Sequence, residues 1–218
     1  MLAAARQAVS GRLIVTEADL DEGAAVLVAC EPRFAQALAR AGRPPLRRRE
    51  DGFAALLRIM VSQQLSVAAA ETIWARLEAA GGADPQRLLR LDDAGLRACG
   101  LSAPKMRYAR ALAAAPLDYA ALRMSPEAEA VAALTEVTGV GRWTAEIYLM
   151  FCIGRADVFA PGDLALQEGA RLLFGLPARP SPAALAAMAE DWSPWRAVAA
   201  RLLWAYYGAV KRREGVGT

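Results

Sequence analysis

Two glycines interrupt a helical pattern at TGVGRWTAE, residues 138–146. The residues before it, 127–136, and those from Arg142 onward each have the apolar spacing of a helix, so Gly139 and Gly141 fall in a short connection. A helix N-terminus placed there would present unpaired backbone N–H groups, which bind phosphate together with the helix dipole. A glycine connection is also typical of a plain corner between two helices. The glycines alone favour the plain corner.

The chain contains no histidine among its 218 residues. This excludes Ser-His-Asp and Cys-His nucleophile pairs, and every zinc site that uses histidine. The three cysteines, Cys30, Cys99 and Cys152, are scattered, so they predict neither a disulfide framework nor a metal cluster. Any catalysis must therefore use carboxylates, lysine, tyrosine, thiols or backbone dipoles.

The composition is that of a globular protein, with 56% hydrophobic and 22% charged residues. No apolar run is long enough for a membrane span, and Arg6 and Arg12 interrupt the N-terminal stretch. We therefore expect no signal peptide, no membrane partner and a cytoplasmic location. The net charge of +3 gives only weak support for a polyanionic partner.

Helices are the elements that must position these residues, because apolar residues recur with helical spacing along most of the chain, as over residues 53–60. Residues 12–17, RLIVTE, are the only candidate strand, and the charged proline loop at residues 42–51 is the clearest boundary. The sequence therefore predicts an all-α fold. Helix starts are expected at the capping or first-turn residues Ser66, Asp84, Asp92, Ser102, Ser125 and Ser181.

Four motifs in order resemble the helix-hairpin-helix DNA glycosylase superfamily. LTEVTGVGRWTA resembles the family's hairpin, and Asp163 in DVFAPGD follows it by about twenty residues, as the family's aspartate does. IMVSQQLSVAAA before the hairpin and WSPWRAVAARLLWAYY after the aspartate resemble one branch, the bacterial 3-methyladenine DNA glycosylase II type. Together the motifs cover roughly residues 50–210.

The resemblance implies two helical lobes, with the helix-hairpin-helix motif and an active-site cleft between them. Residues 46–218 would form this core, and residues 1–45 would pack on the C-terminal lobe. The family's larger bacterial members have an additional N-terminal β-rich domain, and the residues before the first motif are too few for it in full. The position of Gln64 in SQQLS is variable in the family.

By the same resemblance, the reaction is hydrolysis of the N-glycosidic bond of a damaged base. Its transition state has oxocarbenium character, so Asp163 would be the catalytic carboxylate that stabilises the cation, orients water, or does both. Asp163 also occupies the N-cap position of the helix expected to begin at Leu164, and the two roles are compatible. An alkylated purine that is already cationic leaves without a general acid, which suits a chain without histidine.

A cationic base stacked on tryptophan gains about 1–2 kcal/mol when it is desolvated. Ile147 and Leu164 match pocket positions that are aromatic in some relatives, so the pocket of this chain would be roomier or less selective. The three other tryptophans, Trp74, Trp192 and Trp195, are expected in the core. The positions that match the family's base pocket are Trp143, Trp204, Gln63, Ile147 and Leu164.

Further residues would contact the DNA by resemblance. Gln64 would fill the gap left by the extruded base, although two glutamines at a helix end can also simply face solvent. Gly139, Gly141 and Thr144 would bind a phosphate without reading sequence. Arg142 and Arg47–Arg49 could contact either DNA or water. The carbonyls that match an alkali-cation site, for sodium or potassium, are those of Thr135, Val137 and Val140.

Trp143 occupies the hairpin position where bifunctional relatives have a Schiff-base lysine. The lysines here, Lys105 and Lys211, lie in other motifs, so we expect a monofunctional enzyme that leaves an abasic site. Iron–sulfur relatives need four closely spaced C-terminal cysteines, and none follows Cys152, so we expect no cluster and no other cofactor.

The sequence therefore predicts a monomeric alkylpurine-DNA glycosylase that acts on damaged double-stranded DNA near the bacterial nucleoid. A glycosylase for uracil, ethenoadenine or an oxidised purine is an alternative, because pocket shape decides the lesion. A non-catalytic DNA-binding module is a second alternative, and the presence of Asp163 argues against it.

Overall fold

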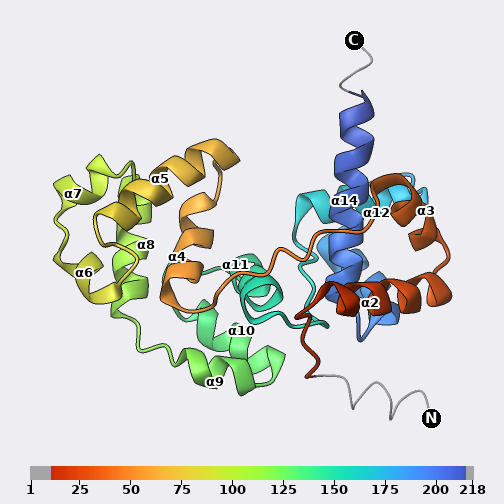
Figure 1. Cartoon of the computed structure of the whole chain (residues 1–218), viewed down its shortest axis with the longest axis horizontal. Helices are drawn as coiled ribbons and strands as arrows, with labels where there is room; N and C mark the ends of the chain where they lie inside the picture. Colours follow the sequence, from red (N-terminus) through yellow and green to blue (C-terminus); the bar gives the residue numbers. More distant parts are fainter. Residues whose placement is uncertain (1–10, 215–218) are drawn as a thin grey trace. The chain divides into compact units, whose positions relative to one another are not determined.

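The computed structural model describes residues 11–214, and this part of the chain is helical (Figure 1). Its only β-pairing among the described residues is an isolated antiparallel bridge between Leu13 and Arg155. The prediction of an all-α fold is confirmed. The prediction of a candidate strand over residues 12–17 is wrong, because Thr16 already caps a helix that begins at Glu17. The part of the expected N-terminal segment before residue 11 lies outside the described residues.

The chain divides into two compact units. Residues 49–153 form a continuous one, here called the hairpin unit because it contains Gly139 and Gly141. The segments on either side, up to Arg48 and from Gly154, form the other, here called the terminal unit. Among the helices described in both units, none is long and apolar enough to cross a membrane.

The hairpin unit is built around α4 (Phe53–Ser62), which packs against α5, α8 and α11. Leu56, Leu57 and Met60 of α4 are buried, as the spacing of apolar residues predicts. A π-helical turn, η1 (Leu149–Ile153), extends α11. The other helices are α5 (Val67–Ala79), α6 (Pro85–Arg90), α7 (Asp93–Ala98), α8 (Ala103–Ala114), α9 (Tyr119–Met124), α10 (Glu127–Thr135) and α11 (Arg142–Tyr148).

Side-chain caps set the start of several of these helices. Ser66 accepts the N–H of Ala69, and Asp84 and Asp92 likewise accept N–H groups in the first turns of α6 and α7. The predicted starts at these three residues are confirmed. Ser102 occupies the N-cap position of α8 but makes no capping hydrogen bond through its side chain.

The start expected at Ser125 is displaced by a helix that the sequence pattern does not predict. Asp118 caps α9 by accepting the N–H groups of Ala120 and Ala121, and Ser125 ends α9 as its C-cap. Pro126 then occupies the N-cap position of α10. The expected α10 therefore exists, and its first residue is Glu127.

In the terminal unit, α14 (Arg196–Glu214) packs against three helices, α2, α3 and α12 (Figure 1). Gly169 of α12 allows a close approach, since a Cβ there would lie 2.7 Å from the carbonyl oxygen of Leu203. Trp192 and Trp195 of this unit are buried, and so is Trp74 of the hairpin unit, as expected for core tryptophans. Besides α14, the unit has α2 (Glu17–Cys30), α3 (Arg33–Ala41), α12 (Leu164–Phe174), α13 (Pro182–Ala189) and the 3-10 turn η2 (Glu190–Trp192).

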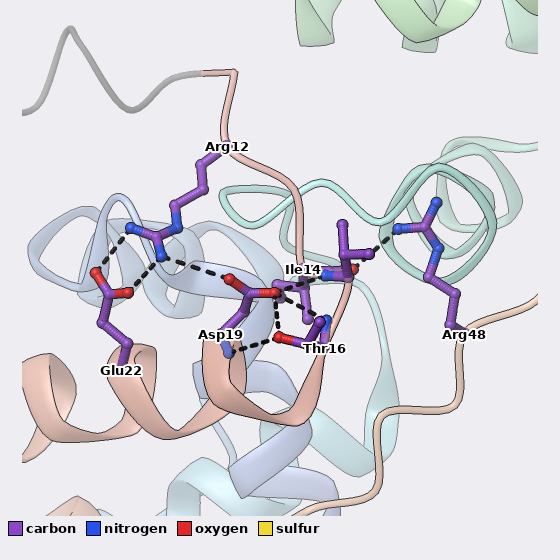
Figure 2. Close-up of polar contacts among 7 residues, drawn as sticks. Arg12, Ile14, Thr16, Asp19, Glu22 and Arg48 are labelled. Carbon is purple, nitrogen blue, oxygen red and sulfur yellow. Dashed lines mark hydrogen bonds and ion pairs between the residues drawn. The ribbon is translucent and has the colours of Figure 1, made fainter.

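The segment before α2 is tied into the terminal unit by polar contacts (Figure 2). Arg12 pairs with Glu22 and lies over the ring of Trp195, 4.4 Å from its centroid. The guanidinium of Arg48 donates to the carbonyl of Ile14 at 3.0 Å. The sequence does not decide whether Arg48 contacts DNA or water. In the structure Arg48 holds the segment before α2 in place.

Candidate functional site

The connection between α10 and α11 is a tight turn that requires glycine at one position. The N–H of Val140 donates to the carbonyl of Val137 at 2.9 Å and closes the turn. Gly139 has φ +94°, and a Cβ there would lie 2.4 Å from Cγ of Tyr108. Both the backbone conformation and the packing against Tyr108 therefore exclude a side chain at Gly139.

Gly141 has a different environment from Gly139. It is the N-cap of α11, with φ −85° and ψ 168°, values that any residue adopts. A Cβ at Gly141 would meet nothing within 4 Å. The fold therefore does not require glycine there, and the position leaves the start of α11 accessible.

A hollow of about 680 Å³ lies over this turn within the hairpin unit. We call it the hairpin hollow. It brings together most of the predicted phosphate, cation and wedge positions, and it adds six residues that were not predicted as site residues. Its lining consists of Gln63, Gln64, Ser102, Pro104, Lys105, Tyr108, Thr135, Glu136, Val137, Thr138, Gly139, Val140 and Gly141.

Lys105 fixes the turn that follows α4. Its ammonium group donates to the carbonyls of Val61 and Gln63, at 2.7 Å each. These carbonyls lie at the C-terminal end of α4, where a cation is favourable. Burial lowers the pKa of Lys105. Gln64, next along the chain, is exposed and has φ +58°, an uncommon conformation for a residue other than glycine.

Gln63 and Thr144, both predicted to contact DNA, are hydrogen-bonded to each other. The amide nitrogen of Gln63 donates to the hydroxyl of Thr144 at 2.6 Å. Thr144 is only 2% exposed, so its side chain faces the protein interior. Any contact between Thr144 and a phosphate would therefore involve its backbone N–H at the start of α11.

Glu146 is a buried carboxylate beside the turn, only 2% exposed. It accepts from Nε of Arg142 at 2.8 Å, whereas the Arg142 side chain is mostly exposed. Burial raises the pKa of Glu146 to about 7, and the Arg142 charge opposes this shift. The buried carboxylate of Glu146 thus orients the Arg142 side chain, most of which faces solvent. On the same helix, Trp143 and Ile147 are half-buried and one turn apart.

Asp163 stands at the N-terminus of α12, and three hydrogen bonds end on its Oδ1 atom. The N–H groups of Ala165 and Leu166 donate at 2.9 and 3.0 Å. The indole N–H of Trp204, on α14, donates at 3.1 Å. The N-cap role that the sequence indicated for Asp163 is confirmed.

The loop before Asp163 is fixed by Gln167, which is buried and was not singled out from the sequence. Its amide nitrogen donates to the carbonyl of Pro161 at 2.8 Å. Leu164, directly after Asp163, is 63% exposed. The predicted catalytic, pocket, wedge, phosphate and cation residues therefore fall into two groups. Asp163, Trp204 and Leu164 lie in the terminal unit, and the rest of this set lies in the hairpin unit.

The fold and these residues define a helix-hairpin-helix protein with a carboxylate held at a helix N-terminus. Residues 57–195 match the family described as HhH-GPD superfamily base excision DNA repair protein. The match covers more than half of the chain, and the chain belongs to this family. The resemblance found in the motifs is confirmed.

Several of the similar proteins are named as 3-methyladenine DNA glycosylases or glycosidases. DNA-3-methyladenine glycosylase 1 of Schizosaccharomyces pombe is 33% identical over 166 residues, 72% of each chain. The crystal structure of DNA-3-methyladenine glycosidase from Bacillus halodurans has a TM-score of 0.76 and 34% identity, over 86% of this chain and 89% of that one. A structure of S. pombe 3-methyladenine DNA glycosylase (Mag1) in complex with abasic DNA has a TM-score of 0.75 and 30% identity, over 84% of this chain and 95% of that one.

Proposed function

We propose that this chain is a monofunctional DNA glycosylase that hydrolyses the N-glycosidic bond of alkylated purines in double-stranded DNA and leaves an abasic site. The names of the similar proteins support this activity, and the S. pombe structure with abasic DNA supports a DNA partner. The observation that carries the proposal is Asp163, whose Oδ1 accepts three hydrogen bonds from two helices.

The proposed role of Asp163 depends on its charge and its fixed orientation. As the glycosidic bond breaks, positive charge develops on the sugar, and a carboxylate nearby stabilises that charge most when it does not have to reorient. The capping bonds and the Trp204 bond provide this fixed orientation. The cationic alkylated base leaves as a neutral molecule with the electrons of the broken bond. Water then adds to the sugar carbon and releases one proton to solvent, which leaves the abasic sugar with a hydroxyl group.

The hairpin unit supports the proposed binding step. The backbone around Gly139 and Gly141 would contact a phosphate, because glycine at position 141 leaves the start of α11 uncovered. Gln64 would enter the duplex in place of the extruded base, whose unstacking costs a few kcal/mol. Its exposure and its left-handed conformation at the end of a turn held by Lys105 suit such a wedge.

An alkali cation at the hairpin carbonyls also stays a prediction. The Val137 carbonyl already accepts the N–H of Val140. A carbonyl oxygen has a second lone pair, so this bond is compatible with a cation ligand. The proposed reaction itself uses no cofactor, and the proposed enzyme acts as a monomer.

The substitution Asp163→Asn tests the catalytic role apart from the capping role. Asparagine caps helices as well as aspartate does, so the fold should be kept while the charge is lost. We expect release of methylated purines from alkylated duplex DNA to fall by at least about a hundredfold. Binding to DNA that contains an abasic-site analogue should remain. Uracil and 8-oxoguanine duplexes assayed in parallel would reveal a different lesion preference.

Asp118→Asn is the matched control, because Asp118 Oδ1 caps α9 through the N–H groups of the second and third residues after it, as Asp163 does for α12. This variant should release methylated purines at the wild-type rate. Wild-type protein that binds DNA but releases no base from any of these substrates would show a non-catalytic DNA-binding module. Equal release by Asp163→Asn and wild type would remove Asp163 from catalysis.

A further inference from the structure

A second hollow, of about 520 Å³, lies in the terminal unit beside the start of α12. We call it the α12–α14 hollow. Leu164, Glu168 and Arg171 lie on one face of α12, at intervals of four and three residues. Tyr207 and Lys211 lie one turn apart on α14, and Arg179 comes from the segment after α12. The lining is completed by Ala165 and Leu172.

Positive charge is concentrated in the α12–α14 hollow. Arg171, Arg179 and Lys211 line it together with a single carboxylate, Glu168, so its formal charge is +2, whereas the whole chain carries +3. The hydrogen bond from Arg171 lowers the pKa of Glu168, and the charges of Arg179 and Lys211 lower it further. Cations therefore outnumber carboxylates by three to one among the side chains that line this hollow.

We propose that the α12–α14 hollow binds backbone phosphates of the DNA strand next to the nucleotide held at Asp163. This inference rests on the proposed function, because it requires a duplex positioned at Asp163. It adds a contact surface on the terminal unit to the phosphate site proposed at the hairpin.

The spacing along α12 fits this assignment. Leu164, which lines the hollow, directly follows Asp163 and is largely exposed. Arg171 is eight residues beyond Asp163, or about 12 Å along a helix that rises 1.5 Å per residue. A DNA strand carries a phosphate about every 3.4 Å along the duplex axis, so this length corresponds to about three or four nucleotides. A strand that runs past Asp163 would therefore bring several phosphates to the hollow.

The side chains also suit a phosphate partner. Lys211 lies over the ring of Tyr207, 5.0 Å from its centroid, so its ammonium group stays near the hollow. Arg171 is held by Glu168 through a hydrogen bond of 2.8 Å from its Nε. Guanidinium and ammonium groups held in this way bind phosphate oxygens without recognising the base sequence.

The double substitution Arg179→Gln/Lys211→Gln tests the surface through DNA binding. Both side chains are exposed, so thermal unfolding should be unchanged. Affinity for a duplex with an abasic-site analogue should be measured at several salt concentrations. Loss of two phosphate contacts makes the negative slope of log affinity against log salt concentration less steep by about 2. From about 50 to about 200 mM salt, wild type should then lose about tenfold more affinity than the variant.

Arg90→Gln/Arg97→Gln is the control for net charge, since it removes the same two charges from exposed positions that line neither hollow. Its salt slope should equal that of wild type. A wild-type slope in the Arg179/Lys211 variant, or an equal decrease in both variants, would overturn the proposal. Failure of the proposed function appears separately, as wild-type protein that binds DNA but releases no methylated base.

Discussion

At Asp163 one side chain serves both the fold and the proposed chemistry. Its cap stabilises α12 by about 1 kcal/mol, the usual contribution of an N-cap side chain. The bond from Trp204 couples α12 to α14 at the same oxygen atom. The proposed catalytic carboxylate is thus positioned by the groups that fix the helix itself. For this reason the capping and catalytic interpretations of Asp163 are compatible.

Glu146 provides a prediction of pH dependence. Its pKa is about 7 in the folded chain, against 4.5 for an ordinary glutamate. Between these values the folded state binds more protons than the unfolded state, so stability falls as pH rises from about 4.5 to about 7. The loss is about 3 kcal/mol. Glu146→Gln should remove it, so urea unfolding should show the variant more stable than wild type at about pH 8 and similar to it near pH 4.5.

Glu78→Gln is a suitable control for Glu146→Gln, because Glu78 is an exposed glutamate in the hairpin unit. It should have the same pH profile of stability as wild type. If Glu146→Gln and wild type lost stability in parallel between about pH 4.5 and pH 8, Glu146 would not be the titrating group.

The residue types at the site could be predicted from the sequence more readily than their surroundings. Asp163 is recognisable as a cap because it directly precedes a helical pattern, and the structure confirms this role. Glu146 follows Arg142 by four residues, a spacing that also fits a solvated ion pair on a helix surface. Its burial results from packing of α10 and α4 against α11, which local spacing does not encode.

At the scale of elements, the two hairpin glycines have different environments. Gly139 is required by the turn, since its φ is positive and Tyr108 occupies the place of a side chain. Gly141 has neither constraint. The sequence shows the two glycines as equivalent, because neither the φ angle nor the distance to Tyr108 can be derived from the string GVG. The turn therefore sets no requirement for glycine at position 141, and the proposed phosphate contact is the reason to expect one.

A pair of alanine substitutions separates the structural requirement at Gly139 from the phosphate contact proposed at Gly141. Gly139→Ala should destabilise the protein by more than about 1 kcal/mol, through backbone strain and the clash with Tyr108. Gly141→Ala should change stability by less than about 0.5 kcal/mol, yet weaken binding to duplex DNA. Thermal unfolding and DNA titration of both variants provide the measurement. Wild-type affinity in Gly141→Ala would contradict a close approach of phosphate to this backbone.

Helix boundaries show a similar limit of sequence-based prediction. The starts of α5, α6 and α7 follow from capping residues that act within one turn. Helix α9 is only six residues long, and its capping residue, Asp118, lies in a proline-containing connection that resembles a loop. Such a short helix depends on tertiary packing for stability, and Leu122 of α9 is buried.

At the scale of the whole molecule, the terminal unit is formed from two segments of the chain that are far apart in sequence. Helices α2 and α3 pack with α14 in this unit, whereas residues 49–153 form a continuous insertion. Periodicity predicts each helix but not its partner across such an insertion. The division into units therefore depends on long-range contacts that no local motif specifies.

The distribution of lysine over the whole chain leads to the last prediction. The sequence has two lysines, and neither is at the hairpin position occupied by Trp143. Lys105 is bound to two carbonyls, and Lys211 lies beside Tyr207 in the α12–α14 hollow. A Schiff base with the abasic sugar needs an amine at the reacting carbon. Borohydride should therefore trap no covalent complex with alkylated duplex DNA, and the abasic strand should stay uncut until alkali is added.

A trapped adduct would contradict the monofunctional assignment, and the lysines allow its source to be identified. Lys105→Arg and Lys211→Arg keep the charge at each position but remove the primary amine, so the variant that abolished trapping would identify the nucleophile. A bifunctional glycosylase with a lysine nucleophile provides the positive control for the borohydride reaction. If the double variant Lys105→Arg/Lys211→Arg still formed the adduct, neither lysine would be the nucleophile.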